Sequence, residues 1–371
     1  MKRHFLLITA MLFSIATAFA QGGTTGPLTW QLNGNTLTIS GEGAMPDYGY
    51  NEAPWYEYRE SIHTAVMEIG VTTIGNTAFY NCTDMTSITI PNSVTTIGDA
   101  AFRVCRSLTS ITISSSITTI GERAFQRCGL TSIIIPSSVT TIGYAAFILC
   151  TSLTSINVEN GNSAYTSENG VLFDKSKITL ICYPPKKTAN TYVIPGSVTT
   201  IGDMAFVECT NLTSITIPNS VTMIGSTAFY NCTSLTSITN LNPVPVEIDF
   251  TVFDNVDKNT CTLEVPIGSV SAYQNAEIWK EFNIVGIEVG IETIGAVAVK
   301  IYPNPTTGEL KIENGWLRVE NVIIYDVFGK IQKTENGKMG NAIDISHLPA
   351  GAYFVKISTE AGEVVRKVLK E

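Results

Sequence analysis

The apolar residues of this chain recur in a fixed order about every 23 positions. A phrase V/I-T-x-I-G is followed by Ala-Phe, by a cysteine, and by a run of the form L-T-S-I-T-I-P. The phrase begins at Val71, Val94, Ile117, Val139, Val198 and Val221. In the L-T-S-I-T-I-P run the apolar side chains take positions one, four and six, which is the alternation of a short strand with one face toward a core. Stacked turns with strands roughly 4.8 Å apart would bury one continuous core, so the pattern predicts a solenoid.

Two irregularities interrupt the repeat. One spacing is 22 residues because Gly129 alone separates Cys128 from Leu130. One spacing is 59 residues, and within it a strand ending like that of the other turns returns at 191–198. The residues before it, at about 160–190, predict a β-hairpin inserted into the solenoid, with its turn near 174–177.

The ends of the repeat region differ from its interior and divide the chain further. Residues 1–20 have Lys2 and Arg3, an apolar run and a small-residue ending, which predicts a signal peptide. We predict an N-terminal cap hairpin over 21–61, repeats over 62–240, and a C-terminal cap over 241–287 with a short helix carrying Trp279 and Phe282. A linker follows at 288–298, and short alternating strands over 299–371 predict a small antiparallel, Ig-like β-sandwich. The fold class is mainly β, with no span of the membrane in the mature chain.

The repeat resembles a known family. The stretches 71–93 and 94–116, with four further copies, match the pattern L-x-x-I-x-I-P-x-x-V-x-x-I-G-x-x-A-F-x-x-C of the BspA-like leucine-rich repeats. This resemblance implies a surface protein that binds other proteins, since several members bind host matrix proteins.

The last 75 residues resemble the C-terminal sorting domain of proteins exported by the type IX secretion system. The residues that carry this resemblance are Tyr302, Pro303, Asn304, Pro305, Gly329, Gly351 and Tyr353. The resemblance implies that the type IX machinery is a partner, with a route through the periplasm to the outside of a Gram-negative cell. The mature protein would then be released or fixed to the surface.

Six cysteines share one repeat position, which restricts their chemistry. They are Cys82, Cys105, Cys128, Cys150, Cys209 and Cys232. No two lie close enough in sequence for a zinc or C-x-x-C redox motif. Disulfides between adjacent turns remain an alternative in an exported protein, but side chains of a ladder point in parallel. We therefore favour buried packing thiols, and leave Cys182 and Cys261 unassigned.

The net charge and the absence of catalytic motifs exclude several classes of partner and of enzyme. Without the leader the chain has 21 basic and 32 acidic residues and a net charge of −11. This balance argues against nucleic acid and anionic membranes as partners. The sequence has no nucleophile elbow, H-E-x-x-H or P-loop motif, and Asp99, Glu122 and Asp203 are interpreted as solvated turn residues. We predict a protein that is not an enzyme and needs no cofactor or metal.

The candidate binding residues are the outward side chains of the predicted strands. They are Ser87, Thr89, Ser110, Thr112, Ser132, Ser155, Asn157, Ser214, Thr216, Ser237 and Thr239. Ile134 and Asn157 are the only interruptions of this hydroxyl surface. Three hypotheses follow: a protein-binding adhesin, a binder of glycans or regular surfaces, and a structural surface component. The partner is then an extracellular protein or glycan of unknown identity, and we favour the protein.

Overall fold

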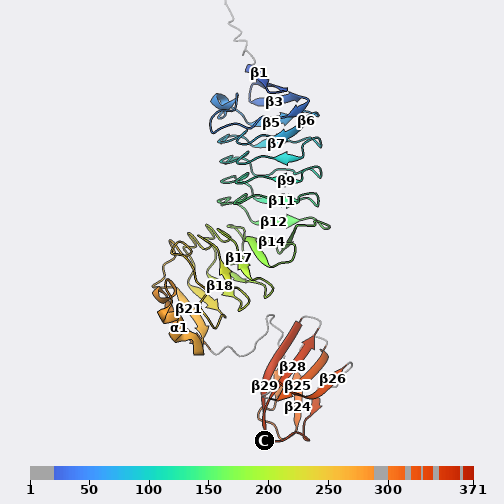
Figure 1. Ribbon diagram of the computed structural model, residues 1–371, viewed down its shortest axis with the longest axis vertical. Helices are drawn as coiled ribbons and strands as arrows, with labels where there is room; N and C mark the ends of the chain where they lie inside the picture. The colour runs from blue at the N-terminus through green and yellow to red at the C-terminus, as the bar shows by residue number, and fades with distance from the viewer. Residues whose placement is uncertain (1–20, 288–299, 314–318, 327–328, 337–341, 360–361) are drawn as a thin grey trace, which may run out of the picture.

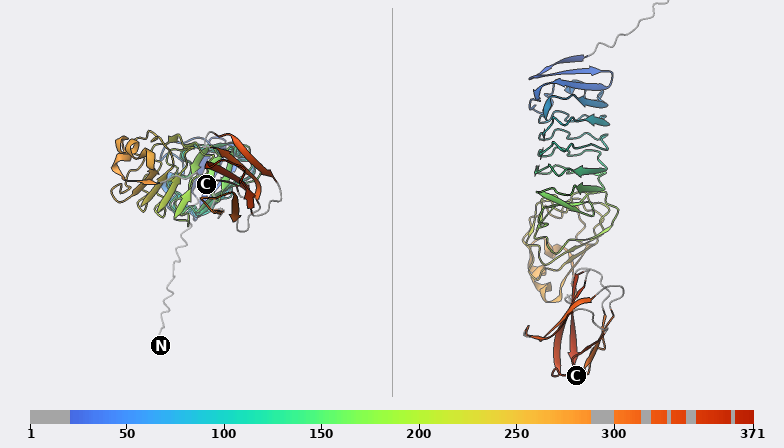
Figure 2. Two further views of the ribbon diagram at one scale, coloured as in Figure 1. Left: turned by 90° about the horizontal axis from the view of Figure 1, so that it is seen from below. Right: turned by 90° about the vertical axis from the view of Figure 1, so that its right-hand side faces the viewer.

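Most turns of the solenoid contribute two short strands, and strands of successive turns pair in parallel. The computed structural model describes residues 21–287, 300–313, 319–326, 329–336, 342–359 and 362–371. The predicted signal peptide and linker lie outside these residues. The turns stack along the long axis of the molecule (Figures 1 and 2), so the mainly β solenoid is confirmed.

The strands of the L-T-S-I-T-I-P runs form three sheets. The sheets, in order, are β1 (Gln21–Thr25), β2 (Leu28–Asn33), β3 (Thr36–Gly41), β5 (Thr64–Met67) and β7 (Ser87–Thr89); then β10 (Ser132–Ile135) and β12 (Ser155–Val158); then β16 (Thr191–Val193), β18 (Ser214–Ile217), β20 (Ser237–Asn240), β21 (Thr262–Pro266) and β22 (Asn283–Ile287). The strands from β3 onward pair in parallel within each sheet, while β1, β2 and β3 form an antiparallel meander at the N-terminal end.

The V-T-T-I segments form further short strands that the sequence pattern did not predict. One sheet comprises β4 (Gly43–Ala44), β6 (Val71–Ile74), β8 (Thr96–Ile97), β9 (Thr119–Ile120) and β11 (Thr141–Ile142), and the other includes β17 (Thr200–Ile201) and β19 (Met223–Ile224). The second sheet begins with the inserted strands β13 (Tyr165–Glu168), β14 (Val171–Asp174) and β15 (Thr179–Cys182), of which β14 and β15 pair antiparallel where the hairpin was predicted. Most of the V-T-T-I strands have only two residues, too short for an alternation to be recognised.

The repeat glycine serves close packing between turns. An added Cβ on Gly121 would lie 2.5 Å from a backbone carbon of Gly98, and one on Gly143 would lie 2.4 Å from the Glu122 amide. Residues in the left-handed region stand elsewhere in the turn, for example Arg123 with a φ of 52° and Arg127 with a φ of 58°. Their amides donate to carbonyls of the next turn, which offsets the cost of roughly 1–2 kcal/mol of that conformation.

Stacked rings run through the interior. Phe102 lies between Phe79 and Phe125 with ring centroids 5.4 Å apart on both sides. Trp55 packs against Phe79 at the N-terminal end of this column. A second column, with Phe206, Phe229 and Phe253, ends at Trp279, which packs edge-on against Phe253, 5.4 Å away. Both tryptophans are buried, so each covers the outer end of a column as solenoid caps do.

The core is divided in two, contrary to the prediction of a single continuous core. One cluster extends from Leu28 to Leu172 and the other from Val171 to Phe282. They adjoin at the inserted strands β13, β14 and β15, and the run of turns changes direction there (Figure 1). The insertion thus separates two stacks of turns because its antiparallel strands do not continue the parallel ladder.

Regular turns extend beyond residue 240. Phe253 stacks on Phe229 at 5.1 Å, and strand β21 pairs in parallel with β20. The one α-helix of the described residues, α1 (Val270–Asn275), precedes Trp279, which lies instead in the 3₁₀ helix η3 (Trp279–Glu281). The prediction that the helix carries Trp279 and Phe282 was wrong, because α1 ends before them: the backbone is extended at Ala276. Two other 3₁₀ helices are η1 (Tyr56–Tyr58) and η2 (Ile267–Ser269).

The C-terminal domain has a core of its own and two antiparallel sheets. They are β23 (Lys300–Tyr302), β24 (Glu309–Glu313) and β27 (Ala342–Asp344), and then β26 (Ile331–Asn336), β25 (Val319–Asp326), β28 (Gly351–Thr359) and β29 (Gly362–Lys370). Alternate residues such as Val322, Ile324, Val355 and Ile357 point into the core, as the strand pattern predicts.

Candidate functional site

The outward side chains of the first set of strands line up in two columns, here called the strand-ladder face. One column follows the pairing of Ser132 with Ser155, and the other follows the pairing of Ile134 with Asn157. In the C-terminal half the same columns run from Thr191 through Ser214 and Ser237, and from Val193 through Thr216 and Thr239. Ser87, Thr89, Ser110, Thr112, Ser132 and Asn157 are exposed; Ser155, Ser214, Thr216, Ser237 and Thr239 are partly exposed.

The structure adds residues to this face that the sequence analysis did not include. They are Thr64, Val66, Thr191, Val193, Thr262, Glu264, Asn283 and Val285. Three side chains of the face are large, apolar and exposed: Ile134 by 57%, Val193 by 51% and Val285 by 43%. The strand ending at 191–198 had been recognised, but only the register of β16 on β18 places Val193 on the face. The face therefore mixes apolar with hydroxyl groups.

The ladder is interrupted between β7 and β10. Ser110 and Thr112 are exposed there, but their segment is not a strand. The next turn is the shortened one, and a Cβ on Gly129 would lie 2.1 Å from the Arg106 carbonyl oxygen. We relate the interruption to the close approach of Gly129 to Arg106, because Arg106 belongs to the same turn as Ser110. The columns therefore contain a break at these two predicted residues.

Other hydroxyls of the repeat are committed to the backbone. Thr154 Oγ1 donates to the Thr131 carbonyl at 2.8 Å, and Thr213 Oγ1 donates to the Asn190 carbonyl at 3.0 Å. On the opposite edge of the turn Ser138 and Ser220 each donate to a carbonyl of the preceding turn at 2.7 Å. These Ser and Thr residues therefore hold turns together, whereas most hydroxyls of the strand-ladder face bond to no backbone group of a described residue.

The acidic residues after the repeat glycine also join turns. The Asp99 carboxylate accepts the Glu122 amide at 2.7 Å, and the Asp203 carboxylate accepts the Ser226 amide at 2.9 Å. Asp99 and Asp203 are exposed, so the prediction of solvated turn residues describes their location but misses this bond. Among the residues that the structure describes, no group of three His, Cys, Asp or Glu side chains could hold a metal ion.

The repeat cysteines are thiols pressed against the preceding turn. Cys128 Sγ lies 2.9 Å from the Phe102 carbonyl oxygen and Cys150 Sγ lies 3.0 Å from that of Phe125. All six ladder cysteines and Cys261 are buried, whereas Cys182 is half-buried, and all eight are free thiols. Burial raises the pKa of the Cys82 thiol to about 12. Such thiols pack and donate weakly to backbone, and they are poor nucleophiles.

We expect the native protein to resist thiol reagents. At pH 8 the reactive thiolate is scarce when burial raises a thiol pKa, as for Cys82 and Cys261. A maleimide assay followed by mass spectrometry should label Cys182 first in the folded protein because its side chain is half-buried, but slowly because burial raises the pKa of this thiol to about 12 as well. After denaturation without reductant, eight labels are expected. Fewer than eight would mean that disulfides join turns, contrary to this assignment.

The sorting-domain residues clamp the beginning of the domain to its last strand. Asn304 Nδ2 donates to the Lys367 carbonyl at 2.9 Å, and its Oδ1 accepts the Leu369 amide at 2.8 Å. Thr306 is buried beside it, and its amide donates to the Leu369 carbonyl. The Tyr353 hydroxyl donates to the Pro349 carbonyl at 2.9 Å. Pro303, Pro305 and Gly351 are exposed, Tyr302 is 46% exposed, and Gly329 takes a φ of 78° in a turn.

Comparison with known proteins identifies both parts of the chain. Residues 72–192 and 176–284 match the family described as BspA type leucine rich repeat region, in six copies. Residues 300–371 match the secretion system C-terminal sorting domain. No curated protein matches the chain. A sorting domain indicates export, and within the described residues no helix has the length and apolar character to cross a membrane.

Solved structures of bacterial leucine-rich repeat proteins are similar to this chain. A leucine-rich repeat protein from Eubacterium ventriosum is 27% identical with a TM-score of 0.52, covering 72% of this chain and 83% of its own. A leucine rich cell surface protein from Faecalibacterium prausnitzii is 24% identical with a TM-score of 0.44, covering 73% and 95%. A leucine-rich repeat protein from Bacteroides ovatus is 20% identical with a TM-score of 0.41, covering 73% and 87%.

Proposed function

This chain belongs to the family of BspA-type leucine-rich repeat proteins, and from that premise we propose that it is an exported adhesin that binds an extracellular protein. Export follows from the sorting domain, which the type IX machinery would recognise. The ligand would be a host matrix or cell-surface protein. The chain has no role as an enzyme in this proposal.

The observation that carries the proposal is the apolar component of the strand-ladder face. Ile134, Val193 and Val285 are 57%, 51% and 43% exposed on a face that otherwise carries small hydroxyls. Because these side chains are about half exposed, covering them with a complementary surface contributes about 0.7–1.5 kcal/mol each. Protein ligands offer apolar surface of this kind, and the parallel columns give an extended, rigid contact area.

The alternative is a glycan or regular-surface ligand that uses the hydroxyls. Thr239 Oγ1 already donates to Glu264 at 2.7 Å, and Ser87 Oγ donates to Thr64 at 3.2 Å. Fewer hydroxyl groups are therefore left on these strands to bond to a glycan. A structural surface component with no discrete ligand is the third possibility. Binding of the purified protein to an array of matrix proteins and glycans separates all three.

Lysine substitutions on the two kinds of residue distinguish the ligands. We expect Ile134→Lys with Val193→Lys to weaken protein binding by about tenfold or more, because two apolar contacts are lost and two charges are added. Surface plasmon resonance against ligands from the array measures this. The matched variant carries Thr89→Lys, Thr112→Lys and Thr216→Lys. Loss of binding only in the threonine variant would favour the glycan ligand, and a clean negative on the array would favour the structural component.

A further inference from the structure

The turn that follows the inserted hairpin is shorter than the others. Thr179 pairs with Thr200 and Leu180 with Ile201, so this turn starts in register with the next. The Tyr183 amide donates to the Ala205 carbonyl, as the Phe206 amide does to Ala228. Tyr183 therefore takes the place of the repeat phenylalanine. Only five residues span Thr179–Tyr183, against seven for Thr200–Phe206, so the bend residues equivalent to Asp203 and Met204 are missing.

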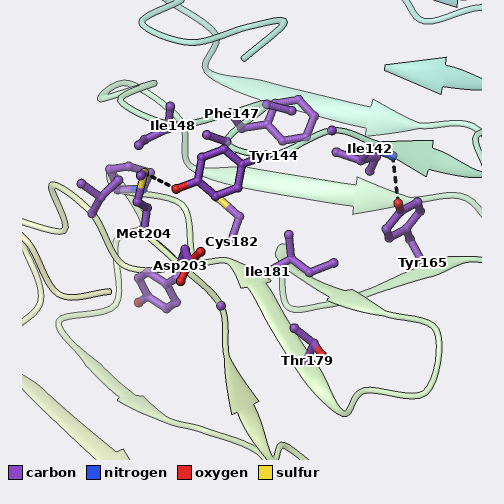
Figure 3. A pocket seen from close by; sticks show the side chains of 17 residues that line it. Ile142, Tyr144, Phe147, Ile148, Tyr165, Thr179, Ile181, Cys182, Asp203 and Met204 are labelled. Carbon is purple, nitrogen blue, oxygen red and sulfur yellow. Dashed lines mark hydrogen bonds between the residues drawn. The ribbon is translucent and has the colours of Figure 1, made fainter. Parts of the chain in front are cut away.

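A cavity of about 280 Å³ occupies the place of the missing bend (Figure 3). Tyr144 and Met204, from the bends on either side, approach across it with Oη 3.9 Å from Sδ. Phe147 and Tyr183 both line the cavity. These two rings are the last members of the two stacked columns, because Phe147 stacks on Phe125 and Tyr183 on Phe206. The cavity is thus mainly apolar and lies beside the ends of both columns.

Backbone groups on both sides of this opening lack the partners that they have elsewhere. In a regular turn three alternate amides donate to the next turn, as Thr77, Phe79 and Asn81 do at 2.8 Å. Ala145, Phe147 and Leu149 hold these positions, yet their amides donate to no acceptor within the described residues. On the other side the carbonyl of Asp203 accepts no backbone amide from described residues. The Val207 carbonyl also lacks one, but there the donor position is held by Pro185, which has no N–H.

The space around Gly202, in the turn that follows the cavity, is also wider than around other repeat glycines. An added Cβ on Gly202 would find its nearest atom 3.0 Å away and the next one at 3.9 Å. At Gly225, one turn later, several atoms lie within 2.7 Å. The backbone on either side of the opening is therefore less tightly stacked than in regular turns. The unpaired amides and the Asp203 carbonyl are therefore left to water or to a partner that supplies both kinds of group.

A second opening of about 350 Å³ is lined by Leu149 and Glu208, the residues that follow Ile148 and Val207 of the first cavity. Arg106 and Arg127 line it, and neither forms an ion pair with a described residue. The Glu208 carboxylate, which also lines the opening, accepts Asn231 Nδ2 at 2.7 Å. The two guanidinium groups outnumber this carboxylate, so the opening has a net positive charge that suits a further carboxylate.

We propose that the two openings together, here called the junction slot, bind an extended peptide segment of a partner protein. Its backbone pairs with the amides of Ala145, Phe147 and Leu149 and, at the missing bend, with the Asp203 carbonyl. An apolar, preferably aromatic, side chain enters the cavity between Tyr144 and Met204, and an acidic residue faces Arg127. Backbone pairing gives affinity in this mode of recognition, and pockets for side chains give specificity. The slot includes no residue of the strand-ladder face, so the inference is independent of the proposed function.

A synthetic peptide with the sequence of residues 200–208, TIGDMAFVE, is a suitable probe. It has the spacing of a regular turn, an aromatic residue and a terminal glutamate. Fluorescence anisotropy of the labelled peptide with the full-length protein should show saturable binding. A peptide with alanine in place of the phenylalanine should bind at least about tenfold more weakly. Bound peptide should also slow labelling of Cys182, which lines the cavity.

Two protein variants locate the binding. Cys182→Phe fills the cavity and should abolish binding with an unchanged circular dichroism spectrum. The exposed substitution Arg127→Glu should weaken binding about fivefold, and a peptide with lysine in place of its glutamate should restore it. No saturable binding up to about 1 mM overturns the proposal. The proposal is also overturned if the alanine peptide binds as tightly as the original peptide. Equal affinity of the Arg127→Glu protein for the glutamate and lysine peptides overturns it too. If Cys182→Phe fails to fold, the charge exchange decides alone.

Discussion

Removal of residues 299–371 is expected to abolish delivery of this protein to the cell surface. These residues include the whole sorting domain, whose described residues form a core separate from the cores of the solenoid. The truncated chain would retain its caps, with Trp279 buried at the C-terminal end, and so should fold and accumulate in the periplasm. Protease shaving of intact cells and immunoblotting of cell fractions measure the distribution.

A matched variant separates loss of the domain from general damage. Thr89→Ala changes one exposed hydroxyl and should leave export at the level of the unmodified chain. Thr306→Val removes the buried hydroxyl that accepts the Gly308 amide and donates to the Glu309 carbonyl. It should reduce export, because the domain loses a clamp worth about 1–3 kcal/mol. Surface delivery of the truncated chain at the normal level would contradict the assignment of the sorting domain.

The second large effect is expected from Phe102→Ala. Phe102 is fully buried between two rings 5.4 Å away on each side, so the substitution leaves a cavity that stacked turns cannot close. We expect the free energy of unfolding to fall by about 3–5 kcal/mol. Urea denaturation followed by tryptophan fluorescence measures it, since Trp55 and Trp279 lie in different core clusters.

Phe147→Ala is the matched substitution for this test. Phe147 stacks on Phe125 at 5.8 Å but borders the junction cavity on its other side. Fewer contacts are lost there, so a smaller loss of stability than for Phe102→Ala is expected. The Phe102→Ala change should also shift the transition of the N-terminal cluster more than that of the C-terminal one, because the two cores are separate. Equal losses for both substitutions would contradict the divided core.

Much of the candidate site could be predicted because a strand alternates with a period of two. Ser87 and Thr89 are exposed, as the alternation requires, and Ser132 and Ser155 are paired in register. Val193 could not be placed because the insertion obscures the repeat spacing before it. Glu264 and Val285 lie after the last recognisable phrase, where only pairing with β20 and β21 identifies their position. Their contribution to binding stays a prediction.

The sequence by itself determined the solenoid, its turn length and the buried positions, because each turn repeats the same apolar order. It also determined the sorting domain from local motifs, since those motifs lie within a continuous stretch of chain. Only the tertiary structure decided how turns contact one another. The role of Gly121 in close packing, the bond from the Glu122 amide to Asp99, and the gap beside Phe147 all depend on residues more than 20 positions apart. A short turn becomes a binding slot only when its neighbours stack, because the missing residues leave a space only between neighbouring turns.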